Sequence, residues 1–186
     1  PDTHPMSHLA GWMADHGFAS ARIGYESDSY YFSPRALDCL RSSLPGAEFV
    51  DADLLVNWQR LVKSEAEIEM MRGAARIAEA TMQCAFDGAR PGVRQCDLMA
   101  EVVATQVRGT PQRGGDMAAI HPLILAGEAA TTAHPMWTDA PLADGQTIAF
   151  ELGGCMKRYN VGLARTVPLG TPSDDLRRTA AAVEEG

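Results

Sequence analysis

The chain has 186 residues, of which 46% are hydrophobic and 22% charged, and its formal net charge is −8. This composition is typical of a globular protein with one or two domains. The negative charge argues against a nucleic acid or an anionic membrane surface as partner, because both bind clusters of Lys and Arg. No apolar run is long enough to span a bilayer, and no basic-then-apolar segment predicts a signal peptide.

The cysteines are scattered and have no CxxC or CxxH spacing; they are Cys39, Cys84, Cys96 and Cys155. Such spacing would predict a zinc site or a redox-active pair. Free thiols in a reducing compartment are the simpler interpretation, and they predict a cytoplasmic protein.

The two ends of the chain predict a segment of a longer polypeptide. The chain opens with Pro1 and has no initiator Met, and it closes at Gly186 within an amphipathic helical pattern that begins near Ser173. A natural domain rarely stops in the middle of a helix.

Residues 1–62 predict the C-terminal part of a small α/β domain, because helical and strand patterns alternate along them. The predicted elements are, in order, a helix over residues 4–16, a strand over 21–26, a helix over 34–44, a strand over 48–50 and a linker over 56–62. The first strands of such a domain would lie upstream of Pro1.

A second and larger unit is predicted over residues 63–186. Ser64 and Glu67 form the capping-box pattern that begins a helix, and apolar residues then recur at helical spacing until Gly88. The elements predicted after it are a helix over residues 96–107 and strands over residues 120–125, 147–152 and 159–167. The boundary between the two units is therefore expected near Lys63.

A single carboxylate, Glu151, interrupts the apolar run of the strand predicted over residues 147–152. Its neighbours Ile148, Phe150 and Leu152 favour burial of this strand. Buried Glu residues are rare unless they are paired, hydrogen-bonded or functional. Glu151 is therefore the first candidate for a catalytic residue.

Four other residues are candidates for the site. His134 follows a loop of small residues that packs loosely enough to border a cavity, whereas His121 lies in an apolar strand pattern and is expected to be a core histidine. Trp137 and Tyr159 can either fill the core or face a cationic ligand by cation–π contact. Arg165 lies within a strand and needs an anionic partner if it is buried, and that partner is expected to be structural.

These residues resemble the pita-bread superfamily of creatinase, prolidase and methionine aminopeptidase. In its metal-dependent members, a His follows a small-residue loop, and Asp-Leu-Gly precedes Ser-Asp-Ile-Thr-Arg-Thr. Here His134, Glu151-Leu152-Gly153 and residues 161–166 take those places. The resemblance implies an α+β fold, with part of a pita-bread catalytic domain over residues 63–186 and the end of a creatinase-type N-terminal domain over residues 1–62.

The chain departs from the metal-dependent pattern at two positions. Glu151 replaces an Asp and could still bind a metal through oxygen, but Gly162 replaces the second Asp and has no side chain. A dinuclear site needs several carboxylates to bridge the ions and neutralise their charge. The resemblance therefore implies a site with no metal and no other cofactor, as in creatinase. The remaining ligands of the family, a His and two Glu, would lie beyond Gly186.

Within the metal-free branch, the chain most resembles ectoine hydrolases, over residues 113–120, 133–137 and 150–159. This resemblance implies a hydrolase that opens the cyclic amidine ring of ectoine to N-acetyl-diaminobutyrate. Glu151 would attack the amidine carbon or activate a water, and His134 would move a proton to the departing nitrogen. The implied substrate contacts are Tyr159, Trp137 and Arg165.

Three other functions stay open. The first is a metal-dependent X-Pro aminopeptidase or prolidase with a degenerate ligand set, and the second is a creatinase-like hydrolase of another amidine or guanidine. The third is a pita-bread domain kept only for protein binding, against which the presence of both Glu151 and His134 counts. Members of the superfamily are homodimers, so the resemblance also implies a homodimer that acts on a small molecule.

Overall fold

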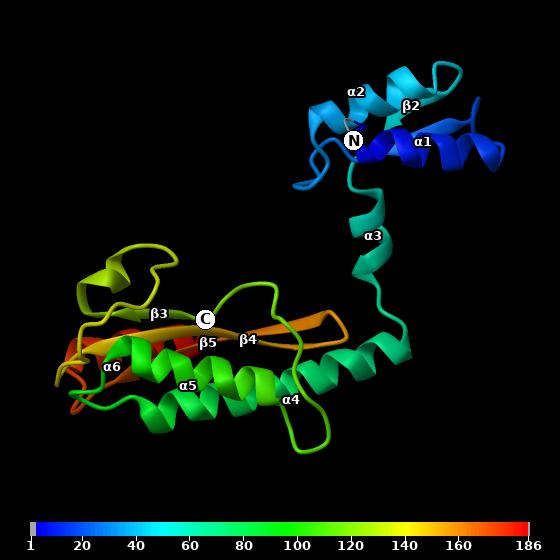
Figure 1. Cartoon of the computed structure of the whole chain (residues 1–186). Coiled ribbons are helices and arrows are strands. Elements are labelled where there is room, and N and C mark those ends of the chain that lie inside the picture. Colours follow the sequence, from blue (N-terminus) through cyan, green and yellow to red (C-terminus); the bar gives the residue numbers. More distant parts are fainter. Residues whose placement is uncertain (1–2, 186) are drawn as a thin grey trace. The chain divides into compact units, whose positions relative to one another are not determined.

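The computed structural model describes residues 3–185, which fall into two compact units that divide after Lys63. Most elements of each unit are labelled in Figure 1. In the described part of the chain, no helix combines the length and the apolar character that crossing a membrane requires.

The first unit combines three helices with a two-stranded parallel sheet. Its elements are α1 (Pro5–Asp15), β1 (Arg22–Tyr25), α2 (Pro34–Ser43), β2 (Glu48–Asp51) and α3 (Leu55–Leu61). The helix α2 begins with Pro34 directly after Ser33, whose Oγ accepts a hydrogen bond from Ala36 N at 3.2 Å. Proline in the first turn and a serine cap are frequent at helix starts. The order of helices and strands is the predicted one as far as β2.

Most of the linker predicted over residues 56–62 forms the helix α3, which the sequence analysis does not predict. Neither Gly nor Pro interrupts residues 54–62, so the backbone is free to continue in helical conformation. Its first turn is closed by Trp58 N, which donates to Leu54 O at 2.8 Å. None of the helical residues is buried.

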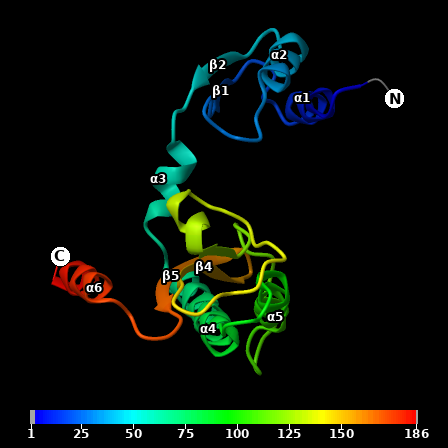
Figure 2. The same cartoon turned by 90° about the vertical axis from the view of Figure 1, so that its left-hand side faces the viewer.

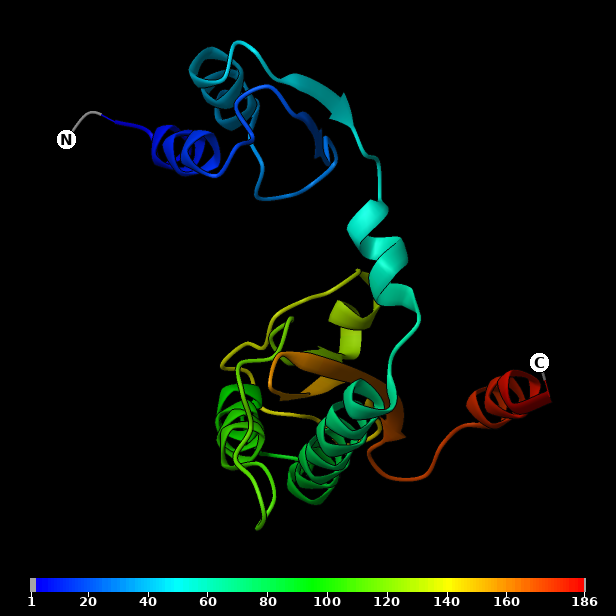
Figure 3. The ribbon, with the colours of Figure 1, turned by 90° about the vertical axis from the view of Figure 1, so that its right-hand side faces the viewer.

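The second unit is a three-stranded antiparallel sheet with two long helices on one face. Its elements are α4 (Glu65–Gly88), α5 (Gln95–Arg108), β3 (Leu123–Ala126), the 3-10 helix η1 (Gly127–Thr131), β4 (Thr147–Met156), β5 (Tyr159–Pro168) and α6 (Asp174–Glu185). The strand order is β3-β4-β5. The helices α4 and α5 lie on one side of this sheet and η1 lies on the other (Figures 2 and 3). The loop after η1 returns to the start of α5, where Cys96 N donates to Thr138 O at 3.0 Å.

The helix α4 starts where the sequence predicts. Ser64 and Glu67 form the complete capping box, in which Ser64 N donates to Glu67 Oε2 at 2.7 Å and Glu67 N donates to Ser64 Oγ at 3.4 Å. The buried residues of α4 recur at helical spacing and face the sheet; they are Ala74, Ile77, Ala78, Thr81, Met82 and Ala85.

The core of this unit lies between the two helices and β4. The side chains of Ile148, Phe150 and Leu152 are essentially fully buried, together with Ile124 of β3 and Val102 of α5. Alternate residues of a strand point to opposite faces, so this single set of β4 residues fixes which face of the sheet is the core face.

The strand predicted over residues 120–125 begins later than expected. Its first residue is Leu123, and Pro122, which has no N–H to donate to a sheet, precedes it. His121 therefore lies outside the strand and is exposed, so the expectation of a core histidine is wrong. The strand predicted over residues 147–152 is longer than expected and runs to Met156.

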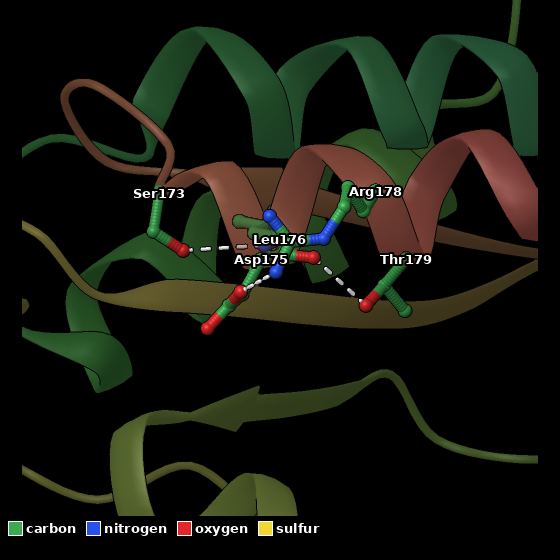
Figure 4. A network of polar contacts seen from close by, with 5 residues as sticks. All are labelled: Ser173, Asp175, Leu176, Arg178 and Thr179. Carbon is green, nitrogen blue, oxygen red and sulfur yellow. Dashed lines mark hydrogen bonds and ion pairs between the residues drawn. The ribbon is translucent and has the colours of Figure 1, made fainter.

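The helix α6 is held by contacts among its own residues (Figure 4). Ser173 Oγ accepts a hydrogen bond from Leu176 N at 3.2 Å, and Asp175 pairs with Arg178 one turn later. Thr179 Oγ1 donates to the carbonyl oxygen of Asp175 at 2.9 Å. Because none of the residues of α6 described by the structure is buried, these capping and side-chain pairs supply its local stability.

Candidate active site

Glu151 lies on the sheet face opposite the two long helices. Its neighbours Phe150 and Leu152 point into the core, so the alternation of β4 turns Glu151 to the other face. Its side chain is 35% exposed. The burial predicted for this strand holds for Phe150 and Leu152, whereas Glu151 is only partly buried, because alternate residues of a strand face opposite sides of the sheet.

His134 is brought to Glu151, although the two residues belong to different elements. His134 lies in the loop that follows η1, and its Nε2 is 3.7 Å from Glu151 Oε2. This separation is longer than a hydrogen bond and short enough for an ion pair when the imidazole is protonated. The His134 side chain is 72% exposed, so a ligand can reach it from solvent.

The backbone of His134 has a φ of 53°, in the left-handed region that residues other than Gly adopt infrequently. Such a conformation costs free energy and persists where the surrounding structure imposes it. At His134 it accompanies the close approach of the imidazole to Glu151. The loop conformation thus contributes directly to the geometry of this pair.

A pocket of about 260 Å³ adjoins Glu151 on the open face of the sheet. Its lining residues are Ile120, Glu151, Leu152, Gly162, Leu163 and Ala164. Ala164 of β5 is the register partner of Glu151, and Gly162 lies two residues away on the same face. No atom lies within 4 Å of the position that a Cβ of Gly162 would occupy, so the missing side chain leaves open space in the pocket.

Few side chains on this face of the described chain are of the kinds that bind metal ions. Within residues 3–185, no group of three His, Cys, Asp or Glu side chains is arranged to hold a metal ion. The face offers one carboxylate, Glu151, and one imidazole, His134, and Gly162 contributes no ligand. A dinuclear centre at this place would therefore take most of its oxygen ligands from residues other than this pair.

Trp137 does not line the pocket of Glu151 but lines a neighbouring pocket. It lines a second pocket of about 390 Å³, whose walls include Met117, His121 and Ile120. Ile120 also lines the Glu151 pocket, so the two pockets share this residue. Trp137 is half-buried and packs against the main core cluster, which confirms the core role that the sequence allows for it.

The structure does not bring Tyr159 to Glu151. Tyr159 lies five residues along β5 from Ala164, which corresponds to about 17 Å at the rise of a β-strand. Its hydroxyl donates to Glu67 Oε1 at 2.9 Å. Tyr159 therefore ties the hairpin of β4 and β5 to the first turn of α4.

Arg165 also lies away from Glu151. Its register partner is Phe150, so its side chain leaves the sheet on the helix side. It is exposed, and its Nη1 donates to the carbonyl oxygen of Ala164 at 2.7 Å. The anionic partner expected for a buried Arg165 is not required, because the guanidinium remains in water.

The sequence does not indicate that Ile120 lines the Glu151 pocket, because an apolar residue carries no chemical signal of its own. Nor does it indicate that Asn160 Oδ1 accepts a hydrogen bond from Ala119 N, at 2.9 Å, directly before Ile120. The available signal was proximity, because Asn160 lies two residues before Gly162 and so shares its face of β5.

Residues 69–186 match Metallopeptidase family M24. The chain belongs to this family. It is 38% identical over 192 residues to "Ectoine hydrolase" of Halomonas elongata, a match that covers 100% of this chain and 48% of that protein. It is also 38% identical over 185 residues to an uncharacterized hydrolase/peptidase, y4tM, of Sinorhizobium fredii, with 100% of this chain and 47% of that protein covered. The chain thus spans about half the length of these relatives.

Solved structures of the family share the fold of the chain. An X-Pro aminopeptidase from Thermotoga maritima superposes with a TM-score of 0.83 at 22% identity, over 97% of this chain and 48% of that one. The prolidase from Pyrococcus furiosus gives a TM-score of 0.77 at 20% identity, over 95% of this chain and 49% of that one. At these identities the likeness establishes the fold, and the predicted partial pita-bread fold is confirmed.

Proposed function

We propose that the protein is a hydrolase that opens the ring of ectoine or of a closely related cyclic amidine, without a dinuclear metal centre. The observation that carries the proposal is the approach of His134 to Glu151 beside an open pocket. The 38% identity to "Ectoine hydrolase" along the whole chain supports the substrate class. Because the chain spans about half of that relative, the activity is proposed for the whole protein.

The chemistry of the pocket suits an amidine. A protonated amidine is a flat cation, and the Glu151 carboxylate on the pocket wall attracts it. Most of the other lining residues, such as Ile120, Leu163 and Ala164, are apolar. Apolar walls with few polar groups are typical of small-molecule sites, and the polar groups fix the orientation of the ligand.

Glu151 can act on the amidine carbon by two routes. Its carboxylate oxygen can add to this carbon directly, or it can take a proton from a water whose oxygen adds there. One carbon–nitrogen bond of the ring then breaks, and His134 in its protonated form gives the departing nitrogen a proton. In the direct route a water then adds to the carbon that is bonded to Glu151 and releases the carboxylate, so that both routes add one water molecule in total. The product from ectoine is an acetylated diaminobutyrate with a free amine.

The proposal is tested by incubating the whole protein with ectoine, creatine and an X-Pro dipeptide, each with and without a chelator, and by following the products by NMR. Ring opening of ectoine that persists with chelator is expected, and Glu151→Gln should reduce it by at least about a hundredfold. The matched control is Glu79→Gln, which removes the same charge from the exposed side of α4. Absence of ectoine turnover by the wild-type protein would refute the proposal.

A metal-dependent X-Pro aminopeptidase or prolidase is the alternative that the family itself favours, because M24 is a metallopeptidase family. The donor set beside Glu151 counts against it, since Gly162 offers no ligand. The dipeptide arm of the experiment decides between them. X-Pro cleavage that is lost with chelator and restored by Mn²⁺ or Co²⁺ would replace the amidine hydrolase with the peptidase, and turnover of creatine alone would favour a creatinase-like enzyme.

A further inference from the structure

We propose that Ile120 sets the size of the substrate that reaches Glu151, and that Asn160 is the residue that positions Ile120. The inference deepens the proposed function and rests on it for the identity of the substrate. Its starting point is that Ile120 lines both the 260 Å³ pocket of Glu151 and the 390 Å³ pocket of Trp137.

The segment that carries Ile120 is held on the sheet by two hydrogen bonds. Asp116 N donates to the carbonyl oxygen of Cys155 at 3.0 Å, and Ala119 N donates to Asn160 Oδ1 at 2.9 Å. Residues 116–122 form no strand or helix of their own, so these bonds fix a stretch that has no regular ladder. Ile120 follows directly after the second bond.

The amide of Asn160 is itself oriented by a second contact. Its Nδ2 donates to the carbonyl oxygen of Arg158 at 3.0 Å, which turns Oδ1 toward the segment. Asn160, Gly162 and Ala164 alternate along β5 and share one face of the sheet. The anchor of the segment therefore stands on the same face as the pocket that Ile120 lines.

Gly162 lines the same pocket and adds no side chain to it. No atom lies within 4 Å of the position of its absent Cβ. Ile120 is the lining residue with a bulky side chain that this pocket shares with the second one. The residue is 53% exposed, so shortening its side chain need not disturb the core.

Beyond Ile120, the second pocket offers mostly apolar walls, among them Trp137 and Val103. Ile120→Ala removes three carbon atoms from the partition between the two pockets. The joined space would accept a longer alkyl group on the amidine carbon than the methyl group of ectoine. The residue thus determines specificity, because it acts on which amidine fits and leaves the reacting groups of Glu151 and His134 unchanged.

The test compares kcat/KM of the whole protein for ectoine and for its homologue with a propyl group on the amidine carbon. Ile120→Ala is expected to shift the ratio toward the propyl homologue by about tenfold or more, mainly through KM. The matched control is Met117→Ala. Met117 is 77% exposed, lies in the same segment and lines the second pocket without lining the first. Its loss should move the ratio by less than about threefold.

Two variants of Asn160 test the positioning role. Asn160→Ala should shift the ratio in the same direction as Ile120→Ala, because Ala119 N loses its acceptor. Asn160→Asp keeps an oxygen acceptor for Ala119 N but loses the Nδ2 donor to Arg158 O, so it should return the ratio part of the way to the wild-type value. A purely structural role would lower kcat for both substrates alike, with no rescue by Asp. An unchanged ratio in Ile120→Ala, or an equal shift in Met117→Ala, would overturn the inference.

A second measurement does not depend on the reaction and separates this inference from the proposed function. Gly162→Cys places a thiol in the pocket, and its rates of labelling by methyl and benzyl methanethiosulfonate are followed by peptide mass mapping. Adding Ile120→Ala is expected to raise the benzyl rate relative to the methyl rate by about tenfold. An unchanged ratio of rates would refute the role of Ile120 even if ectoine is turned over. A raised ratio without ectoine turnover would support it and refute the proposed function.

Discussion

Gly154 of β4 and Ala74 of α4 stand in direct backbone contact across the core of the second unit. A Cβ built on Gly154 would lie 2.1 Å from the carbonyl oxygen of Ala74 and 2.5 Å from Ala78 N. Both atoms belong to the backbone of α4, so neither can turn aside as a flexible side chain would. The absence of a side chain at Gly154 is what lets α4 lie against β4.

The first prediction follows from this contact. Gly154→Ala should lower the free energy of unfolding by about 3 kcal/mol, because overpacking forces the helix away from the sheet. Unfolding in urea, followed by circular dichroism on the whole protein, measures the loss. The control is Gly153→Ala, the adjacent residue, whose Cβ would meet Val161 O at an ordinary 3.4 Å. Equal losses in the two variants would show that the backbone contact is not the cause.

The second prediction separates the structural role of Tyr159 from a role in substrate binding. Tyr159→Phe removes the hydroxyl that donates to Glu67 Oε1 and should cost about 1 kcal/mol of stability. It should leave kcat/KM for ectoine within about twofold, because Tyr159 lies about 17 Å along β5 from the partner of Glu151. A KM that rises tenfold with unchanged stability would instead place Tyr159 in the substrate site.

Tyr159 and Arg165 are predicted to contact the substrate beside Glu151, but the structure places both away from it. The cause is the turn of the β4–β5 hairpin. Lys157 and Arg158 connect β4 to β5 and have φ values of 48° and 69°. Two positive φ values in a two-residue hairpin loop are typical of a type I′ turn, which Asn-Gly or Asp-Gly sequences signal and Lys-Arg does not. The turn fixes the register, and the register fixes which side chains share a face with Glu151.

Other parts of the chain could be predicted because their signals are local. The start of α4 follows from Ser64 and Glu67, which lie three residues apart and cap the same turn. The approach of His134 to Glu151 has no such signal. It depends on the path of the loop after η1, and only the resemblance to a known family indicated the pair. The exposure of Glu151 likewise depends on which face the helices cover.

The third prediction concerns the missing side chain at Gly162. Gly162→Asp should reduce ectoine hydrolysis at least about tenfold, because it fills the pocket and places a like charge beside Glu151. The same variant should bind Mn²⁺ at least about tenfold more tightly than the wild-type protein, as measured by calorimetry, since it adds a carboxylate ligand. Gly162→Asn controls for size and should lose activity with a smaller gain in affinity. Tight stoichiometric Mn²⁺ in the wild-type protein would contradict the underlying interpretation.

The fourth prediction concerns the thiol of Cys155. This residue of β4 is fully buried, and its carbonyl oxygen accepts a hydrogen bond from Asp116 N. Burial raises the pKa of this thiol, and the charge of Asp116 adds to the effect, whereas the backbone N–H and the positive charge of Arg158 oppose it. The folded protein therefore holds this proton more tightly than the unfolded chain. The stability that this group contributes is complete below the thiol pKa of the unfolded chain and is lost as the pH rises above it.

The measurement is the free energy of unfolding between about pH 8 and about pH 10, for the wild-type protein and for Cys155→Ala. The wild-type protein should lose more stability over this range, by at most about 1.4 kcal/mol per pH unit, which is the limit for one proton. In the native state Cys155 should also react with a thiol reagent more slowly than Cys39, Cys84 and Cys96, which are half-buried. Parallel pH curves for the two proteins, together with rapid labelling of Cys155, would mean that its thiol ionises as freely in the folded protein as in the unfolded chain.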